Sequence, residues 1–228
     1  MKKAILCLVL CLVALPMMAS TIIIGNPPDQ GSGNSFPFGT AYNAEYQQVY
    51  ASSAFNTGPI QITDLYLYNT QYNSGATQTP SGTYTVSLST TSAGVGSLSP
   101  TFSDNIGLNN TQVFNGSIQQ SWNFGNTLDI HFTTAFNYDP NGGNLLVDVV
   151  GNGISIPINI YYDVSSNGPF QRVYCPFGSA CSTGVADTPG YGLVTGLGYN
   201  TGVPEPGTLL MMGTGLVGVV GAIRRCIL

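Results

Sequence analysis

The sequence predicts an all-β fold: one antiparallel β-sandwich, jelly-roll-like, placed between an N-terminal signal peptide and a C-terminal transmembrane helix. Three observations support this prediction. Apolar side chains recur at every second residue in many short segments, as they do in strands with one buried face. Turn-forming pairs rich in Asn, Asp and Gly separate these segments. Between the two ends of the chain, no segment shows the apolar period of a soluble helix.

The strand predictions rest on this alternation. Residues 83–89 read TYTVSLS, so that the tyrosine, valine and leucine share one inward face, whereas residues 145–150 are apolar on nearly both faces and predict a central strand. Asp64 breaks the alternation of residues 60–68, which predicts a β-bulge. Pro157 places its strand at an edge or a bulge. In chain order we expect strands at residues 21–24, 46–51, 60–68, 83–89, 112–118, 128–133, 145–150, 154–160 and 191–199. We expect turns at Asn115-Gly116, residues 139–143, Asn152-Gly153 and Asn167-Gly168.

The first 20 residues have the layout of a secretory signal peptide. Lys2 and Lys3 precede an uninterrupted apolar run at residues 4–15, and a proline ends that run. The run is too short to span a bilayer, and the small residues Ala19 and Ser20 offer a cleavage site. We therefore expect an exported domain at residues 21–202.

A second apolar segment lies near the end of the chain. Residues 207–223 carry no charge, and as a helix they would be about 25 Å long, near the lower limit for a membrane span. Arg224 and Arg225 open a short basic tail at residues 224–228. Because basic residues beside a membrane segment stay in the cytoplasm, the preceding domain is expected outside.

The motif Val203-Pro204-Glu205-Pro206 stands directly before this apolar segment, and its two prolines hold the chain extended. Together with the helix and the arginines, it resembles the PEP-CTERM sorting signal of exopolysaccharide-producing Gram-negative bacteria. The resemblance covers residues 203–228, although residues 226–228 replace the further basic residues that are usual there.

The resemblance implies that a membrane-embedded exosortase, a cysteine transpeptidase, recognises the motif and removes the tail. It also implies a precursor anchored in the inner membrane with its domain in the periplasm, and then a protein at the cell surface or in the extracellular matrix. It implies no activity for the domain itself.

The charge of the domain excludes one class of partner. Arg172 is the single basic residue between the two ends, against nine acidic residues. Nucleic acid is excluded, because one arginine cannot form a phosphate-neutralising surface, and an anionic membrane surface is disfavoured for the same reason. The many tyrosines and phenylalanines disfavour disorder, and about 180 residues can bury one ordinary core.

Cys175 and Cys181 are the cysteines that remain after removal of both ends, and five residues separate them. An exported chain is expected to oxidise such a pair to a disulfide. Metal binding and redox activity are the alternatives, and both lack partner residues, because the one histidine is distant and the spacing is not Cys-x-x-Cys.

Catalytic residues are not expected. His131 is the only histidine, and Asp129 precedes it on the same predicted strand face, where it could orient the imidazole. No nucleophile motif accompanies the pair. Paired carboxylates for glycoside hydrolysis are a second candidate, and their separation cannot be read from the sequence. Those carboxylates would come from Glu45, Asp64, Asp129, Asp148 and Asp163.

A calcium site is more plausible than a catalytic site, because turns offer the oxygen ligands that this ion prefers. Asp104, Asn105, residues 139–141 and Asp187 could supply them, although no loop has the EF-hand pattern. Ordinary Asx turns explain the same residues, so we predict no cofactor.

Two non-enzymatic functions remain, and a secreted hydrolase is a distant third. The first is a structural or adhesive module associated with exopolysaccharide or a biofilm matrix. The second is a glycan-binding module, in which aromatic rings stack on sugars and polar side chains bind the hydroxyl groups. Its candidate contacts are Trp122, Tyr162 and Asp163. Exposure of Trp122 and Tyr162 would favour glycan binding, and burial of both would favour the structural role.

Overall fold

The computed structural model describes residues 19–25, 33–70 and 77–201, and over these residues the protein consists of antiparallel strands and four short 3-10 helices. The all-β prediction is therefore confirmed. No helix in these ranges is long and apolar enough to cross a membrane. The predicted signal peptide and the predicted transmembrane helix at residues 207–223 fall almost wholly outside the described residues.

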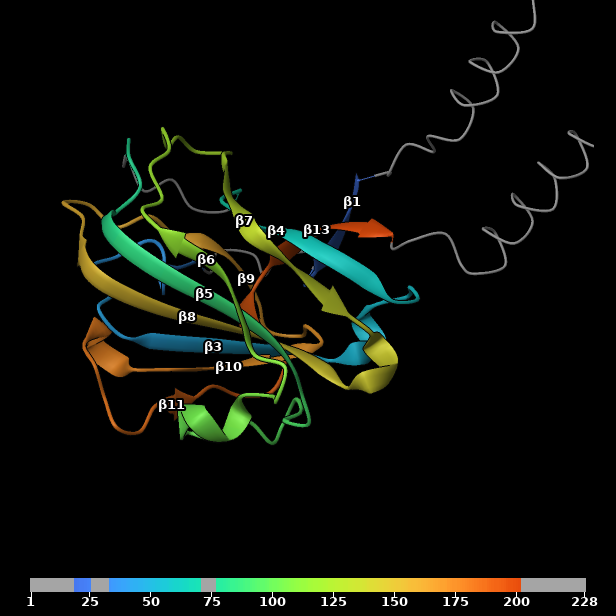
Figure 1. The fold of residues 1–228 in the computed structure, drawn as a ribbon. Coiled ribbons are helices and arrows are strands. Elements are labelled where there is room, and N and C mark those ends of the chain that lie inside the picture. Colours follow the sequence, from blue (N-terminus) through green and yellow to red (C-terminus); the bar gives the residue numbers. More distant parts are fainter. Residues whose placement is uncertain (1–18, 26–32, 71–76, 202–228) are drawn as a thin grey trace, which may run out of the picture.

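Two large sheets form separate layers (Figure 1). The order in the four-stranded sheet is β1 (Ala19–Ile24), β13 (Thr195–Thr201), β4 (Ile60–Tyr68), β7 (Thr127–Tyr138). The order in the six-stranded sheet is β11 (Val185–Ala186), β10 (Phe170–Tyr174), β3 (Glu45–Tyr50), β8 (Asn144–Ser155), β5 (Ser81–Thr91), β6 (Thr111–Gly116). A small third sheet joins β12 (Gly192–Leu193), β9 (Tyr162–Ser165) and β2 (Gly33–Asn34). The 3-10 helices are η1 (Ser52–Ala54), η2 (Phe102–Asn105), η3 (Pro140–Gly142) and η4 (Pro176–Gly178).

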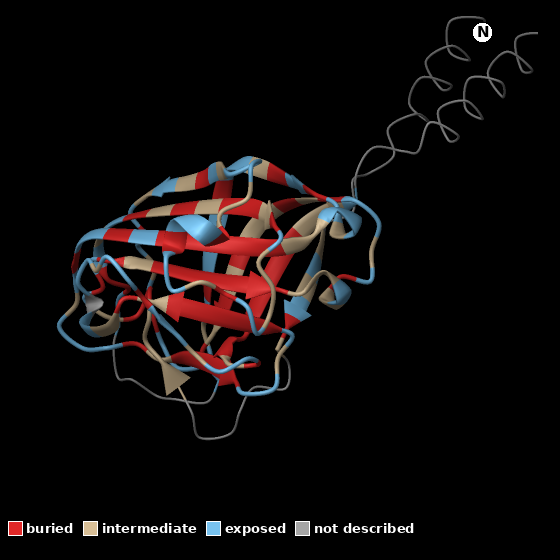
Figure 2. Cartoon of the chain, turned by 90° about the horizontal axis from the view of Figure 1, so that it is seen from below, coloured by how far each residue is buried: buried red, intermediate tan, exposed pale blue. Residues whose placement is uncertain are grey.

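The core lies between the two large sheets. Leu65 and Leu67 of β4 and Val86 and Leu88 of β5 belong to one buried cluster, although they come from different sheets. Each of these side chains alternates with a less buried residue along its strand, as Figure 2 shows by the change of colour along the strands. Burial of each such side chain contributes about 1.5 to 3 kcal/mol. The two sheets therefore form a sandwich, and the jelly-roll wrapping stays a prediction.

The predicted bulge in β4 is confirmed. The register between β4 and β7 shifts between Ile62 and Asp64, and Ile62 and Leu65 both point into the core on either side of the shift. Relative to β13, Thr63 is the extra residue of β4, because Ile62 lies opposite Tyr199 and Asp64 lies opposite Gly198. Beyond it, Asp64, Tyr66 and Tyr68 lie on the outer side of the sheet. This local irregularity decides which side chains of β4 face solvent.

The strand predicted at residues 154–160 is wrong. Strand β8 ends at Ser155, and Ile158 is 52% exposed instead of facing the core. Pro157 lacks an N–H group, so the segment cannot continue a ladder of backbone hydrogen bonds. Its apolar alternation misled the prediction because Ile154 and Ile160 are indeed buried.

Two predicted turns lie within strands instead. Asn115-Gly116 ends β6, and Asn152-Gly153 lies in β8, where Gly153 has a φ of 63°. The β5–β8 register shifts between Ser81 and Thr83, opposite this glycine, so the Asn-Gly pair forms part of a bulge. The turn predicted at residues 139–143 contains η3 and joins β7 to β8 as expected.

The first and last described strands lie side by side. Strand β1 pairs antiparallel with β13, and Ala19 lies opposite Asn200. The described domain therefore begins and ends on the same side of one sheet. Strand β13 ends at Thr201, immediately before the residues of the sorting motif.

Candidate functional site

The residues of the sorting signal, Val203 to Pro206 and the pair Arg224 and Arg225, lie outside the described residues. What the structure does show is their point of attachment. Strand β13 is hydrogen-bonded between β1 and β4, so Thr201 is held to the sheet. The sorting signal therefore follows directly on a strand of the folded domain.

The glycan contacts predicted at Trp122 and Tyr162 are wrong. Trp122 is 1% exposed and Tyr162 is fully buried, and their rings meet edge to face at 5.4 Å. The backbone N–H of Trp122 donates to the carbonyl of Thr77, which fixes the loop so that the indole points inward. Phe124 is the aromatic residue that this loop leaves exposed. Neither predicted ring can stack on a sugar.

The third predicted contact, Asp163, is also buried, at 2% exposure. Its carboxylate accepts hydrogen bonds from the backbone N–H of Thr70 at 2.8 Å and from the Thr70 hydroxyl at 2.6 Å. The side chain therefore ties β9 to the end of β4, and it is not presented to a ligand.

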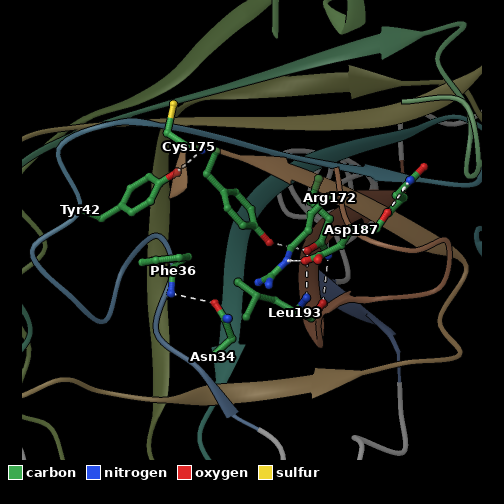
Figure 3. Close-up of polar contacts among 10 residues, drawn as sticks. Asn34, Phe36, Tyr42, Arg172, Cys175, Asp187 and Leu193 are labelled. Atoms are coloured by element: carbon green, nitrogen blue, oxygen red, sulfur yellow. Dashed lines mark hydrogen bonds and ion pairs between the residues drawn. The ribbon is translucent and has the colours of Figure 1, made fainter. Parts of the chain in front are cut away.

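Cys175 and Cys181 are joined by a disulfide. Cys175 is buried, and its backbone N–H donates to the hydroxyl of Tyr42 at 2.9 Å, a contact drawn in Figure 3. The loop that the bridge closes carries Phe177, which is 94% exposed and has a φ of 66°. Positive φ is uncommon for a residue with a bulky side chain.

Arg172 is buried, at 3% exposure, in the centre of Figure 3. Its guanidinium lies 4.8 Å from the ring centre of Tyr174 and 4.7 Å from that of Tyr191, and its Nε donates to the carboxylate of Asp187 at 2.6 Å. Its Nη1 is buried, with no hydrogen-bond partner among the described residues. The two rings and the carboxylate of Asp187 together compensate the buried charge of Arg172, and they hold β10 to the segment after β11.

A polar network beside Arg172 joins three strands. The amide of Gln48 accepts from the hydroxyl of Tyr46 and from the N–H of Leu193, and it donates to the hydroxyl of Tyr50. Tyr50 in turn donates to Thr195. Burial raises the pKa of both Tyr46 and Tyr50, so the phenols stay neutral donors. The network is a structural connection between β3, β12 and β13.

The predicted calcium ligands are engaged locally. Asp139 accepts two hydrogen bonds from Asn141, as in an ordinary Asx turn, and Asp104 accepts one from the hydroxyl of Ser99. Asp187 is the ion-pair partner of Arg172. Within the described ranges, no three His, Cys, Asp or Glu residues gather closely enough to hold a metal ion.

His131 pairs with a different carboxylate from the one predicted. Its Nδ1 lies 2.5 Å from Oδ1 of Asp64, its cross-strand neighbour on β4. The charge of Asp129 affects the pKa of His131 less than Asp64 does. The imidazole is 80% exposed, and the hydrogen bond to Asp64 raises the pKa of His131.

Sequence reasoning missed the surface around this pair, which we name the outer face. Cross-strand neighbours of the four-stranded sheet form two rows there, with all side chains on the solvent side. The first row consists of Thr21, Gly198, Asp64 and His131, and the second consists of Ile23, Gly196, Tyr66 and Asp129. Tyr68 follows Tyr66 along β4. The sequence does contain a signal for the outer face, because polar and aromatic residues alternate with apolar ones in β4 and glycines occupy alternate positions in β13.

Four of the five candidate carboxylates form two groups, and the fifth, Asp163, is bonded to Thr70 as described above. Asp64 and Asp129 share the outer face, whereas Glu45 and Asp148 lie close together on the far side of the six-stranded sheet. Burial and the neighbouring charge of Glu45 raise the pKa of Asp148 to about 7. Gln47 donates to Glu45 and to the carbonyl of Phe102, so η2 covers this second pair. Asp148 is buried and Glu45 is partly buried, so the raised pKa of Asp148 follows from lost hydration beside a second carboxyl group.

Together these observations describe a β-sandwich domain that is followed directly by the residues of a C-terminal sorting signal. A family model described as the PEP-CTERM protein-sorting motif matches residues 202–225, so the chain carries this motif, as predicted. The motif marks an exported protein that an exosortase processes at the membrane. The match does not extend into the sandwich.

The other comparisons add no argument about function. One solved structure, titled "Crystal structure of the T13 IBDV viral particle reveals a missing link in icosahedral viruses evolution", aligns with 84% of this chain at 11% identity and a TM-score of 0.23. This chain spans 40% of the length of that chain. No curated protein matches the sequence.

Proposed function

We propose that the protein is a structural or adhesive module that an exosortase releases to the cell surface or to an extracellular, exopolysaccharide-containing matrix. The observation that carries this proposal is the PEP-CTERM motif at residues 202–225, which follows directly on the last strand of the sandwich. Because β1 and β13 pair, both apolar ends of the precursor attach on the same side of the domain. A domain attached in this way can be anchored at one membrane surface until it is processed.

The interior of the domain supports a structural role. The residues proposed for glycan contact, Trp122, Tyr162 and Asp163, are all part of the packed interior. The single arginine of the described residues is also buried, so it cannot attract an anionic substrate. We propose that the domain is not an enzyme and that its polar interior serves rigidity.

The sorting part of the proposal is tested by changing Pro204 and Pro206 together to Ala. The substitution removes the two residues that hold the motif extended. Precursor of full mass should accumulate in the inner membrane, as measured by cell fractionation and mass spectrometry. The matched control changes the exposed Pro157 and Pro189 of the domain to Ala, and it should be processed normally.

Normal processing of the Pro204 and Pro206 variant would show that recognition does not depend on the two prolines. A wild-type protein that keeps its full mass in the membrane would show instead that the apolar tail is a permanent anchor. A glycan-binding function is the second candidate. It now rests on the outer face instead of the residues first predicted, and it is developed below.

A further inference from the structure

The outer face combines exposed aromatic rings with polar groups on a flat sheet. Ile23 is 47% exposed, His131 is 80% exposed, and the two tyrosines of β4 are partly exposed. Among the described residues, no strand or helix is paired across this face. An exposed surface of this kind on a secreted domain is a candidate binding site.

The side chains of Tyr66 and Tyr68 approach the backbone of β13 closely at its glycines. A Cβ atom at Gly198 would come within 3.1 Å of Cε2 of Tyr66, and one at Gly196 would collide with the hydroxyl of Tyr68. Each ring therefore occupies the space that a side chain of β13 would fill. Both tyrosines are partly exposed, so each side chain also contacts solvent. Two residues of a strand span about 7 Å, so the rings follow one another along β4.

We propose that the outer face binds a neutral polysaccharide chain, with the rings of Tyr66 and Tyr68 stacking on successive parts of the sugar chain. The apolar face of a pyranose ring is attracted to such an exposed aromatic surface. This proposal names the partner of the matrix module and rests on the export proposed above, since the polysaccharide lies outside the cell.

Polar groups along the outer face suit the hydroxyl groups of a sugar. Asp64 is held in place by the hydroxyl of Thr63 and by His131, which leaves Nε2 of His131 open to solvent. Asp129 lies one row further along, beside Tyr66. Carboxylates accept hydrogen bonds from hydroxyl groups, and the imidazole can donate or accept, so both kinds of partner are present.

A polar hollow extends this surface beyond β7. Its volume is about 320 Å³, and its walls include the amides of Gln78, Gln119 and Gln120 and the hydroxyl of Ser121. Gln120 exchanges hydrogen bonds with the backbone of Asp129, which places the hollow next to the outer face. Amides supply donors and acceptors to a hydroxyl-rich chain without adding charge.

The charges of the domain favour a neutral polymer as the ligand of the outer face. The outer face carries Asp64 and Asp129, and its one cationic group is the imidazole of His131, already paired with a carboxylate. The only arginine of the described residues is buried, and no lysine occurs among them. A polyuronate or a nucleic acid would be repelled, because nothing here neutralises its charge.

A purely structural explanation makes a different prediction. Aromatic rings laid over strand glycines also stabilise a sheet by themselves. In that case, replacing the tyrosines would lower stability and would leave the protein's behaviour toward polysaccharides unchanged. Measurements of both properties on the same variants separate the two explanations.

The test is affinity electrophoresis of the full-length protein, purified in detergent, through native gels that contain a soluble polysaccharide. Hydroxyethyl cellulose, laminarin, dextran and galactomannan are the neutral probes, and alginate is the anionic probe. We expect at least one neutral polysaccharide to retard the protein and alginate not to do so. Tyr66→Ala and Tyr68→Ala should each raise the dissociation constant about 3- to 10-fold, the range expected for loss of one aromatic contact.

The controls use exposed aromatic residues elsewhere. Phe124→Ala and Phe177→Ala remove exposed rings outside the outer face and should leave retardation unchanged. Trp122 fluorescence and the thermal midpoint show whether each tyrosine variant is folded, and Tyr66→Phe should retain binding if an Ala variant proves unstable. Because retardation is measured on purified protein, failure of the sorting mutant leaves this result unaffected.

Two results would overturn the proposal. If no neutral probe retards the protein, a neutral polysaccharide is not its ligand. If the Tyr66→Ala/Tyr68→Ala double variant is still retarded, the binding site lies outside the two tyrosines. Concentration-dependent self-association that disappears in the same double variant, without retardation of the wild type, would make the outer face a contact between two copies of the chain.

Discussion

Substitution of Asp148 by Asn should stabilise the protein at alkaline pH. Asp148 is 8% exposed, and burial together with the charge of Glu45 raises its pKa from 3.8 to about 7. The folded state therefore binds a proton between about pH 4 and pH 7 that the unfolded state releases. Stability falls as the pH rises through this window, and the full loss is present above pH 7. At 1.36 kcal/mol per pH unit, the upper limit is about 4 kcal/mol.

An asparagine keeps the shape of the side chain and cannot ionise, so Asp148→Asn should recover about 2 to 4 kcal/mol at pH 8 and gain little at pH 4.5. The assay is urea unfolding at pH 4.5, 6 and 8, followed by fluorescence. Trp122 is the only tryptophan of the chain and is 1% exposed, so its emission reports loss of the core.

His131 requires a control, because its pKa is also raised, mainly by the hydrogen bond to Asp64. Its contribution is complete below the pKa of an unfolded histidine and is lost as the pH rises through the folded value, so it has the same sign as that of Asp148. His131→Gln should change the pH profile only slightly, since the ring is exposed. Wild-type stability that does not change between pH 4.5 and 8, or an Asp148→Asn variant with the wild-type slope, would refute the reasoning.

Three further substitutions test the interior. Replacing Cys175 and Cys181 together by Ser should lower the free energy of unfolding by about 2 kcal/mol, as measured by urea titration, and an unchanged value would show that the bridge does not constrain the unfolded chain. Trp122→Ala should lower it by about 3 to 5 kcal/mol, followed by circular dichroism, whereas a loss below 1 kcal/mol would indicate an exposed indole. Arg172→Ala should lower it by about 3 to 5 kcal/mol by leaving Asp187 without its partner, and retention of wild-type stability would contradict the buried ion pair.

The strands with simple alternation were predictable from the sequence, whereas β10, with a buried arginine in its centre, was not. Residues 83–89 and 60–68 lie within or coincide with β5 and β4, because their inward residues are aliphatic or aromatic. Strand β10 was missed, because an arginine in its centre indicates an exposed position. Two tyrosine rings and Asp187 meet around the buried Arg172, and two of these partners, Tyr191 and Asp187, lie outside β10.

The candidate contacts failed for a related reason. A tryptophan in a polar loop indicates exposure when only its neighbours in sequence are considered, yet the loop of Trp122 folds back onto residue 77 and buries the ring. The pairing of His131 with Asp64 depends on the register between β4 and β7, which shifts between Ile62, opposite Phe136, and Asp64, opposite His131. A register set by long-range contacts cannot be derived from either strand alone.

The sorting motif and the outer face illustrate two different kinds of site. The sorting motif is one contiguous stretch, residues 202–225, so it could be found from local sequence without the fold. The outer face needs β1, β13, β4 and β7 in register, because Gly196 and Gly198 leave space on one strand that the tyrosines of another strand fill. Insertion of a side chain at either glycine would therefore lift a ring from the surface without altering any residue that contacts a ligand. Gly198→Ala, which would displace Asp64 and the ring of Tyr66, should consequently weaken polysaccharide retardation more than it affects exosortase processing.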